Sequence, residues 1–310
     1  MYIIILIVFL LYILIFPEES VQAASLGLNL WYEKMLPTLL PFSILSYILI
    51  HSGLLDGFAK ALHRILKHVF PISSAGIYPL IAGLLFGFPM GSKISAELVK
   101  EEKMTREEGQ RLFCVCNNIS PVFIGSFVLN DCLQRPDLRL PSYLILYAPL
   151  LILYMIQNRN QSFTSSIERN IKTDNSSNNL HKKATSMNFQ IIDAGIMNGF
   201  ETLAKLGGYI IMFAILAQMT MLLPISNPII KCLLVGFTEI TNGVSYTAKQ
   251  TLEFELAYPM MMSYLAFGGL SGFAQTASMV KESQFSMIPY FFMKFFGTIV
   301  AFALAFLLVH

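Results

Sequence analysis

The chemistry that this sequence could support is polar chemistry inside apolar surroundings. Asn117, Asn118 and Ser120 lie within the apolar run 112–130, directly before Pro121. An unpaired amide in hydrocarbon costs on the order of several kcal/mol, so these groups must bond to protein, water or a ligand. Two interpretations stay open with equal weight: hydrogen bonds between helices, or contacts to a substrate.

A second feature is a turn that interrupts an apolar segment. The segment 76–92 ends in Gly-Phe-Pro-Met-Gly-Ser, and Lys93 follows at once. A related stretch, 267–282, lies near the other end of the chain. Short apolar segments broken by Gly or Pro, at corresponding places in two halves, are typical of a transporter's binding site. At one constant offset, the matched residues are Gly87, Gly91, Ala96, Val99, Lys100 and Glu101 with Gly268, Gly272, Ala277, Val280, Lys281 and Glu282.

These features favour an anion as the ligand. Exposed N–H groups at the start of a half-helix attract negative charge, and Lys93 adds a positive charge unless it lies at the headgroups. Glu239 ends a short apolar run, where it is either a functional carboxylate at membrane depth or an interfacial residue. The predicted substrate-binding residues are Gly87, Pro89, Gly91, Ser92, Lys93, Asn117, Asn118, Ser120, Glu239, Asn242, Ser271 and Gln275.

Other kinds of chemistry find no support. The sequence has no nucleotide-binding motif, no nucleophile–base pair, no paired catalytic carboxylates and no metal-ligand spacing among its histidines and cysteines. We therefore expect no enzyme, no cofactor and no metal site, and any transport would be secondary. No basic patch is interleaved with aromatic residues, so nucleic acid is not an expected partner.

Composition sets the class of protein. The chain has 310 residues, of which 55% are hydrophobic and 13% charged, and its mean hydropathy is +0.61. Soluble domains are nearer a quarter charged. The apolar runs do not alternate with period two, as barrel strands would. We predict an all-α polytopic membrane protein with two inverted repeats and re-entrant or broken helical hairpins.

The chain divides into four parts. Residues 1–25 form an N-terminal anchor or a signal segment; both interpretations stay open, and a retained anchor is favoured. Residues 26–157 form the first membrane repeat, 158–187 a flexible polar cytoplasmic linker rich in Asn and Ser, and 188–310 the second membrane repeat.

Charge placement predicts the orientation. An amphipathic helix at 55–70 and the basic linker should both be cytoplasmic. The first broken segment then dips in from that side, residues 112–130 make one crossing, and the second dip enters from the opposite side. Lys294, inside the last span 287–309, is expected to snorkel or to pair with a carboxylate.

Several stretches together resemble one family. The chain is similar to sporulation integral membrane proteins of the YlbJ type, within the nucleoside-recognition Gate domain superfamily. The stretches that carry the resemblance are LWYEKMLPTLLPFSIL (30–45), GFPMGSK (87–93), EEGQRLFCVCNNISPVFIGSFV (107–128), KLGGYI (205–210) and GFTEITNG (236–243).

The resemblance implies a multi-pass membrane protein of endospore-forming bacteria, in the mother-cell or outer forespore membrane. It implies a fold similar to concentrative nucleoside transporters and a role in moving dipicolinic acid, a small dianion that suits Lys93. The expected partners are this substrate, the lipid bilayer and a coupling ion, H⁺ or Na⁺; an oligomer is left open. The alternatives are a non-transporting sporulation scaffold or recruitment protein and a nucleoside permease.

Overall fold

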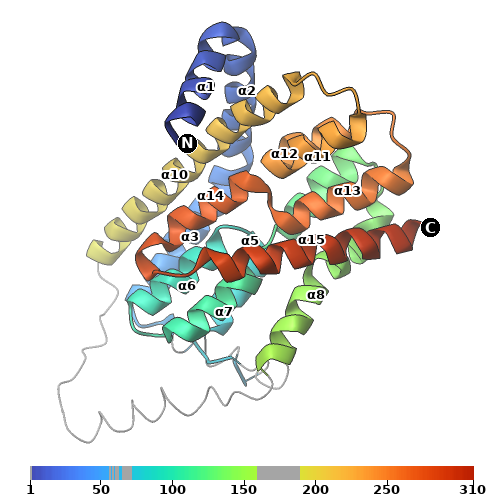
Figure 1. Ribbon diagram of the computed structural model, residues 1–310. Coiled ribbons are helices and arrows are strands. Elements are labelled where there is room, and N and C mark those ends of the chain that lie inside the picture. Colours follow the sequence, from blue (N-terminus) through green and yellow to red (C-terminus); the bar gives the residue numbers. More distant parts are fainter. Residues whose placement is uncertain (1, 56, 58, 60–62, 65–71, 159–188) are drawn as a thin grey trace, which may run out of the picture.

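The computed structural model describes residues 2–55, 57, 59, 63–64, 72–158 and 189–310. Within these residues the regular structure is entirely helical, which confirms the predicted all-α class (Figure 1). Most of the predicted amphipathic helix at 55–70, and the predicted linker 158–187 except Asn158, lie outside the described residues.

Four helical segments in the described part of the chain are long and apolar enough to cross a membrane. They are residues 17–51, 136–156, 189–222 and 287–309. The first combines α2 (Pro17–Leu30), a π-helical turn (Trp31–Met35) and α3 (Leu36–His51), and is preceded by α1 (Tyr2–Ile15).

The same order of elements occurs twice. In each half a long helix is followed by a helical hairpin, a broken helix and another long helix. In the first half these are α3, α5 (Ile77–Phe86) with α6 (Met90–Lys100), α7 (Arg106–Cys116) with the π-helix η2 (Phe123–Cys132), and α8 (Arg139–Asn158). In the second half they are α10 (Phe189–Leu222), α11 (Pro228–Thr238) with α12 (Ile240–Ala248), α13 (Phe254–Phe267) with α14 (Gly269–Val280), and α15 (Met287–Val309).

Glycine pairs allow both hairpins to fold back tightly. In the first hairpin, α5 and α6 pack along each other, and a Cβ atom on Gly91 would lie 2.9 Å from Cα of Gly83. In the second hairpin, α11 packs along α12, and a Cβ atom on Gly243 would lie 2.1 Å from Cα of Gly236. Only residues without a side chain permit this approach of two helix backbones.

The sequence predicted that residues 267–282 dip into the membrane as a second hairpin, and this prediction is wrong. Gly268 interrupts the helix there, but α13 and α14 do not pack along each other; α14 continues beyond α13, and α15 packs along α13 (Figure 1). The second hairpin is instead α11–α12, with Glu239 at its tip. The prediction failed because a hairpin turn at Gly87 (φ 78°) and a helix break at Gly268 (φ 88°) both require glycine at positive φ.

The predicted crossing at 112–130 is interrupted. Helix α7 ends at Cys116, residues 117–120 have no regular structure, and helical structure resumes at Pro121. Pro121 has no N–H to continue the helical ladder. The first half therefore has a broken helix where the sequence predicted a single span, and we refer to residues 117–120 as the first break and to Gly268 and Gly269 as the second break.

Helix α10 joins the two halves by packing along α2 and α3. Trp31 donates a hydrogen bond from its indole N–H to the Leu203 carbonyl at 2.7 Å. Its ring occupies the space left by Gly207, where a Cβ atom would lie 2.9 Å from the indole nitrogen. Gly207 therefore allows α10 to pack closely against Trp31, whereas a Cβ atom on Gly208 would meet nothing within 4 Å.

Candidate functional site

Each hairpin tip lies against a helix break. The Phe88 N–H at the first tip donates to the Asn118 carbonyl at 2.6 Å. The Phe88 ring also lies over α14, where a Cβ atom on Gly272 would be 3.0 Å from it. At the second tip, Ile240 lies 3.3 Å from the position of a Cβ atom on Gly269. The two halves of the chain therefore meet at their interrupted backbones, where main-chain polar groups are not committed to helical ladders.

The Asn117 side chain links the first break to α6, α14 and α15. Its Oδ1 accepts a hydrogen bond from Ser92 at 3.0 Å, and its Nδ2 donates to Thr276 at 2.7 Å and to the Tyr290 hydroxyl at 2.8 Å. Asn117 and Thr276 have no exposed surface. The amide is therefore satisfied within the protein, as the interpretation of hydrogen bonds between helices requires.

Asn118 connects the first break to a buried lysine. Lys294 on α15 donates from Nζ to Asn118 Oδ1 at 2.9 Å, and Asn118 Nδ2 donates to the Val115 carbonyl at 2.6 Å. Lys294 is only 1% exposed, and its ammonium lies 5.7 Å from the centre of the Tyr290 ring. Among the residues that the structure describes, no carboxylate lies within ion-pair distance of this ammonium.

The expectation that Lys294 snorkels or pairs with a carboxylate is therefore wrong for the described part of the chain. The lysine is on the inner face of α15, so its stem cannot reach the surface. Its positive charge is held by the amide of Asn118, a neutral group, at the point where the chain is broken.

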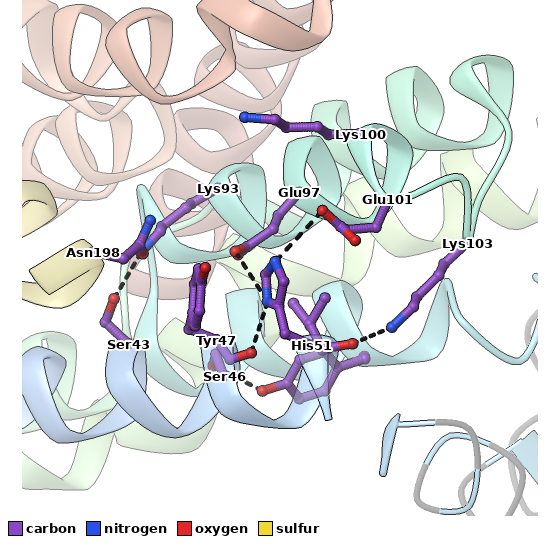
Figure 2. A network of polar contacts seen from close by, with 12 residues as sticks. Ser43, Ser46, Tyr47, His51, Lys93, Glu97, Lys100, Glu101, Lys103 and Asn198 are labelled. Carbon is purple, nitrogen blue, oxygen red and sulfur yellow. Dashed lines mark hydrogen bonds and ion pairs between the residues drawn. The ribbon is translucent and has the colours of Figure 1, made fainter. Parts of the chain in front are cut away.

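Lys93 faces away from this amide cluster. Its Nζ donates to Ser43 on α3 at 2.7 Å and to Asn198 on α10 at 2.6 Å, as Figure 2 shows. Ser92, the preceding residue, faces Asn117 instead. Adjacent residues on a helix point about 100° apart, so the predicted site divides at this position: Ser92 joins the amides and Lys93 does not.

Glu239 and Asn242 are brought together at the second tip. The Glu239 carboxylate accepts from the N–H groups of Thr241 at 3.1 Å and Asn242 at 2.8 Å, and from Asn242 Nδ2 at 2.8 Å. Glu239 is 6% exposed. It is therefore a buried N-cap that neutralises the positive end of α12, and not a residue on an exposed surface.

Ser271 and Gln275 lie one turn apart on α14, after the second break. Gln275 donates from Nε2 to Ser271 at 2.9 Å. Its Oε1 is buried and has no hydrogen-bond partner among the residues that the structure describes. This oxygen is an open acceptor close to the start of α14, and it would be satisfied by a ligand or a water that donates a hydrogen bond.

The remaining predicted residues shape the backbone. Gly87, Pro89 and Gly91 form the tip of the first hairpin, and a Cβ atom on Gly91 would lie 2.5 Å from the Cys116 carbonyl oxygen. The Ser120 hydroxyl accepts from the Phe123 N–H at 3.3 Å and so caps the helical turn that follows Pro121. These residues allow close approach of hairpin and break, and they carry no charge to the site.

Sequence reasoning missed Thr276, Tyr290 and Lys294 as members of the cluster. A lysine inside an apolar span was the available signal for Lys294. Thr276 and Tyr290 gave none, because their partner lies more than 150 residues away along the chain. In the part of the chain that the structure describes, no group of three His, Cys, Asp or Glu residues could hold a metal ion.

Comparison with known proteins confirms the resemblance expected from the sequence. Residues 33–129 match the Gate family model, described as nucleoside recognition. The chain is also similar to the sporulation integral membrane protein YlbJ of Bacillus subtilis strain 168, with 24% identity over 304 residues that cover 89% of this chain and 74% of that protein. No solved structure matches. Together with the apolar helices, this similarity supports a multi-pass membrane protein.

Proposed function

We propose that this protein is a secondary transporter that carries a small organic anion across a bacterial membrane during spore formation. The observation that carries the proposal is the buried ammonium of Lys294, which has an amide partner and no carboxylate among the described residues. Burying one unpaired charge costs several kcal/mol even after relaxation. A bound anion would offset that cost, and the lysine would make the site specific for anions.

Two helix starts reinforce the positive character of this region. Helix α6 begins at Met90 and α14 begins at Gly269, and neither has a side-chain cap. Helix α12, in contrast, begins at the capping carboxylate of Glu239. The free positive ends therefore belong to the two helices that carry Ser92 and Gln275, the helices nearest the amide cluster.

Dipicolinic acid, the substrate implied by the family resemblance, is the anion to test first. It has two carboxylates on one rigid ring. One carboxylate would pair with Lys294, and the other would face the uncapped start of a half-helix. A dianion gains from both positive groups, so it should bind more tightly than a monocarboxylate of the same size.

A nucleoside is the second candidate, and Gln275 favours it. The unpartnered Oε1 of Gln275 needs a donor, which a nucleoside has and a dipicolinate dianion lacks. The matching family model is also described as nucleoside recognition. A nucleoside, however, leaves the charge of Lys294 without a counter-charge, and for that reason we place it second.

Movement of the first hairpin would admit the substrate. The amide cluster is buried in the described structure, with Asn118 and Lys294 each at most 5% exposed. Phe88 lies over the glycines at the start of α14, its N–H donates to the Asn118 carbonyl, and Ser92 donates to Asn117. Opening the tip would break these contacts, and the substrate would replace the hydrogen bonds that are lost.

The test is uptake of labelled dipicolinate by proteoliposomes that contain the full chain. We expect uptake by the wild type, strong loss in Lys294→Met, and normal uptake in the matched control Lys205→Met, an exposed lysine paired with Glu201 on α10. Competition by uridine and not by dipicolinate would favour the nucleoside. No uptake of either compound would favour the non-transporting scaffold.

A further inference from the structure

A second polar region lies outside the amide cluster, on the interface between α3 and α6. Each helix contributes residues at spacings of four, which places them on one face. We call this region the polar seam. Its members are Ser43, Tyr47 and His51 on α3 and Lys93, Glu97 and Glu101 on α6 (Figure 2).

His51 lies between two carboxylates of α6. Its Nε2 is 3.4 Å from Glu101 Oε1, and its Nδ1 is 4.0 Å from Glu97 Oε1. The His51 ring also stacks on the Tyr47 ring, with centroids 3.9 Å apart and an angle of 17° between the planes. The stacking holds the imidazole in the orientation that both carboxylates face.

The partners of His51 call for one proton more than the neutral ring and two ionised carboxylates supply. Nδ1 lies 2.9 Å from the Tyr47 carbonyl oxygen, which can only accept, so Nδ1 must carry a hydrogen. In the neutral ring Nε2 then has a lone pair, and it faces the Glu101 oxygen. Two acceptors cannot bond to each other, and one further proton, on the ring or on the carboxyl group, makes the contact favourable.

Exposure falls along the seam from the surface inward. The exposed fraction is 36% for the Glu101 side chain, 22% for His51 and 13% for Glu97, and Lys93 is 9% exposed as a residue. Figure 2 shows the same order, from Glu101 and His51 at one end to Lys93 and Asn198 at the other. Water can therefore reach the outer end, while the inner end lies one residue from Ser92 of the amide cluster.

Other charged groups around the seam already have partners. Lys103 donates to the Ile50 carbonyl, and Lys100 pairs with Glu282 at 2.8 Å. On α10, the Lys205 ammonium pairs with Glu201 at 2.7 Å. Among the described residues, the charged groups left within the seam are then His51, Glu97, Glu101 and Lys93, and Lys93 donates to the neutral Ser43 and Asn198.

We infer that His51, Glu97 and Glu101 form a proton-binding site that exists only while the first hairpin lies on α3, so that H⁺ is the coupling ion of transport. When α6 leaves α3, the carboxylates separate from the ring and the proton is released to water; when α6 returns, one proton is bound. Proton concentration therefore shifts the position of the hairpin by differential binding. This inference rests on the proposed function.

Proteoliposomes containing the full chain separate coupling from transport. Exchange of labelled dipicolinate at equal pH measures movement of the substrate, and accumulation under a pH gradient measures coupling. A gradient of one pH unit supports roughly tenfold accumulation for each coupled proton. We expect His51→Gln to keep exchange and to lose accumulation by about this factor. The control is Glu282→Gln, which removes an exposed carboxylate paired with Lys100 on α6. This variant should keep both exchange and accumulation.

Wild-type exchange without a response to the pH gradient would overturn the inference and leave the proposed function intact. Accumulation by His51→Gln equal to wild type would also overturn it. If the wild type shows neither exchange nor accumulation, the proposed function fails, and a potentiometric titration of the purified protein decides the proton site. The titration compares the wild type with the double variant Glu97→Gln, Glu101→Gln, which keeps His51. One fewer proton held by the double variant at neutral pH supports the site, and equal proton binding overturns it.

Discussion

Replacement of Lys294 by methionine should weaken substrate binding and stabilise the empty protein. Methionine keeps the length and flexibility of the stem and removes the ammonium. The lysine is 1% exposed and bonds to Asn118 at 2.9 Å. If the ammonium binds an anion, its removal must lower the affinity for the substrate. Because a charge is costly to bury, its removal must also raise the stability of the protein without substrate.

The magnitudes follow from the contacts of Lys294. The desolvation of one buried ion costs several kcal/mol, and its hydrogen bond to Asn118 returns about 1.5–3 kcal/mol. Because the variant leaves the buried Asn118 Oδ1 without this donor, at about 1–3 kcal/mol, Lys294→Met should gain at most about 1 kcal/mol in the free energy of unfolding without substrate. Loss of one charge-assisted hydrogen bond to the substrate predicts an affinity lower by roughly 10-fold to 150-fold.

Thermal unfolding in detergent and titration with dipicolinate measure the two effects on the same samples. Lys205→Met, in which the lost ammonium is about half exposed, should change neither property. A variant Lys294→Met that binds dipicolinate as the wild type does would refute the anion site. A lower unfolding temperature for the empty variant would show that Lys294 is a structural residue whose charge is already compensated.

Four further substitutions test the packing and the capping of the helices that build the site. Gly83→Ala should lower the unfolding temperature strongly, because its Cβ would lie 1.7 Å from the Cys116 carbonyl oxygen; Gly208→Ala, with no atom within 4 Å, should be neutral or stabilising by up to about 1 kcal/mol. Asn117→Ala should cost about 1–3 kcal/mol for each buried group left unpaired, and an unchanged unfolding temperature would contradict its role as a link. Thr105→Ala should cost about 0.5–2 kcal/mol through loss of the N-cap of α7, measured by the same unfolding experiment.

Local chemistry made the turn at Gly87 and the interruption at Gly268 predictable, but not the first break at 117–120. The Gly-Phe-Pro-Met-Gly turn ends α5 and starts α6 where the sequence indicated. Thr105 is the N-cap of α7, because its hydroxyl accepts from the Glu108 N–H at 3.2 Å. The Glu108 carboxylate does not return this bond and instead accepts from the Ser73 N–H at 2.7 Å.

Tertiary contacts determine the features of the site that local sequence patterns did not predict. Gly87 and Gly268 have the same backbone requirement, yet one forms a hairpin and the other a helix break, since packing on α6 and α15 determines the path of the chain. Ser92 and Lys93 are neighbours in the sequence and face different helices. Lys294 belongs to the cluster because it donates a hydrogen bond to Asn118, 176 residues away along the chain. No local sequence pattern encodes such a contact.

Binding of an anion where the hairpin tips meet the helix breaks can be seen in an experimental structure of the full chain with dipicolinate. We expect a carboxylate of the ligand within hydrogen-bond distance of Lys294 Nζ, between the Phe88 tip and the start of α14. Dipicolinate bound elsewhere, with Lys294 still bonded only to Asn118 or paired with a carboxylate of the protein, would contradict this expectation.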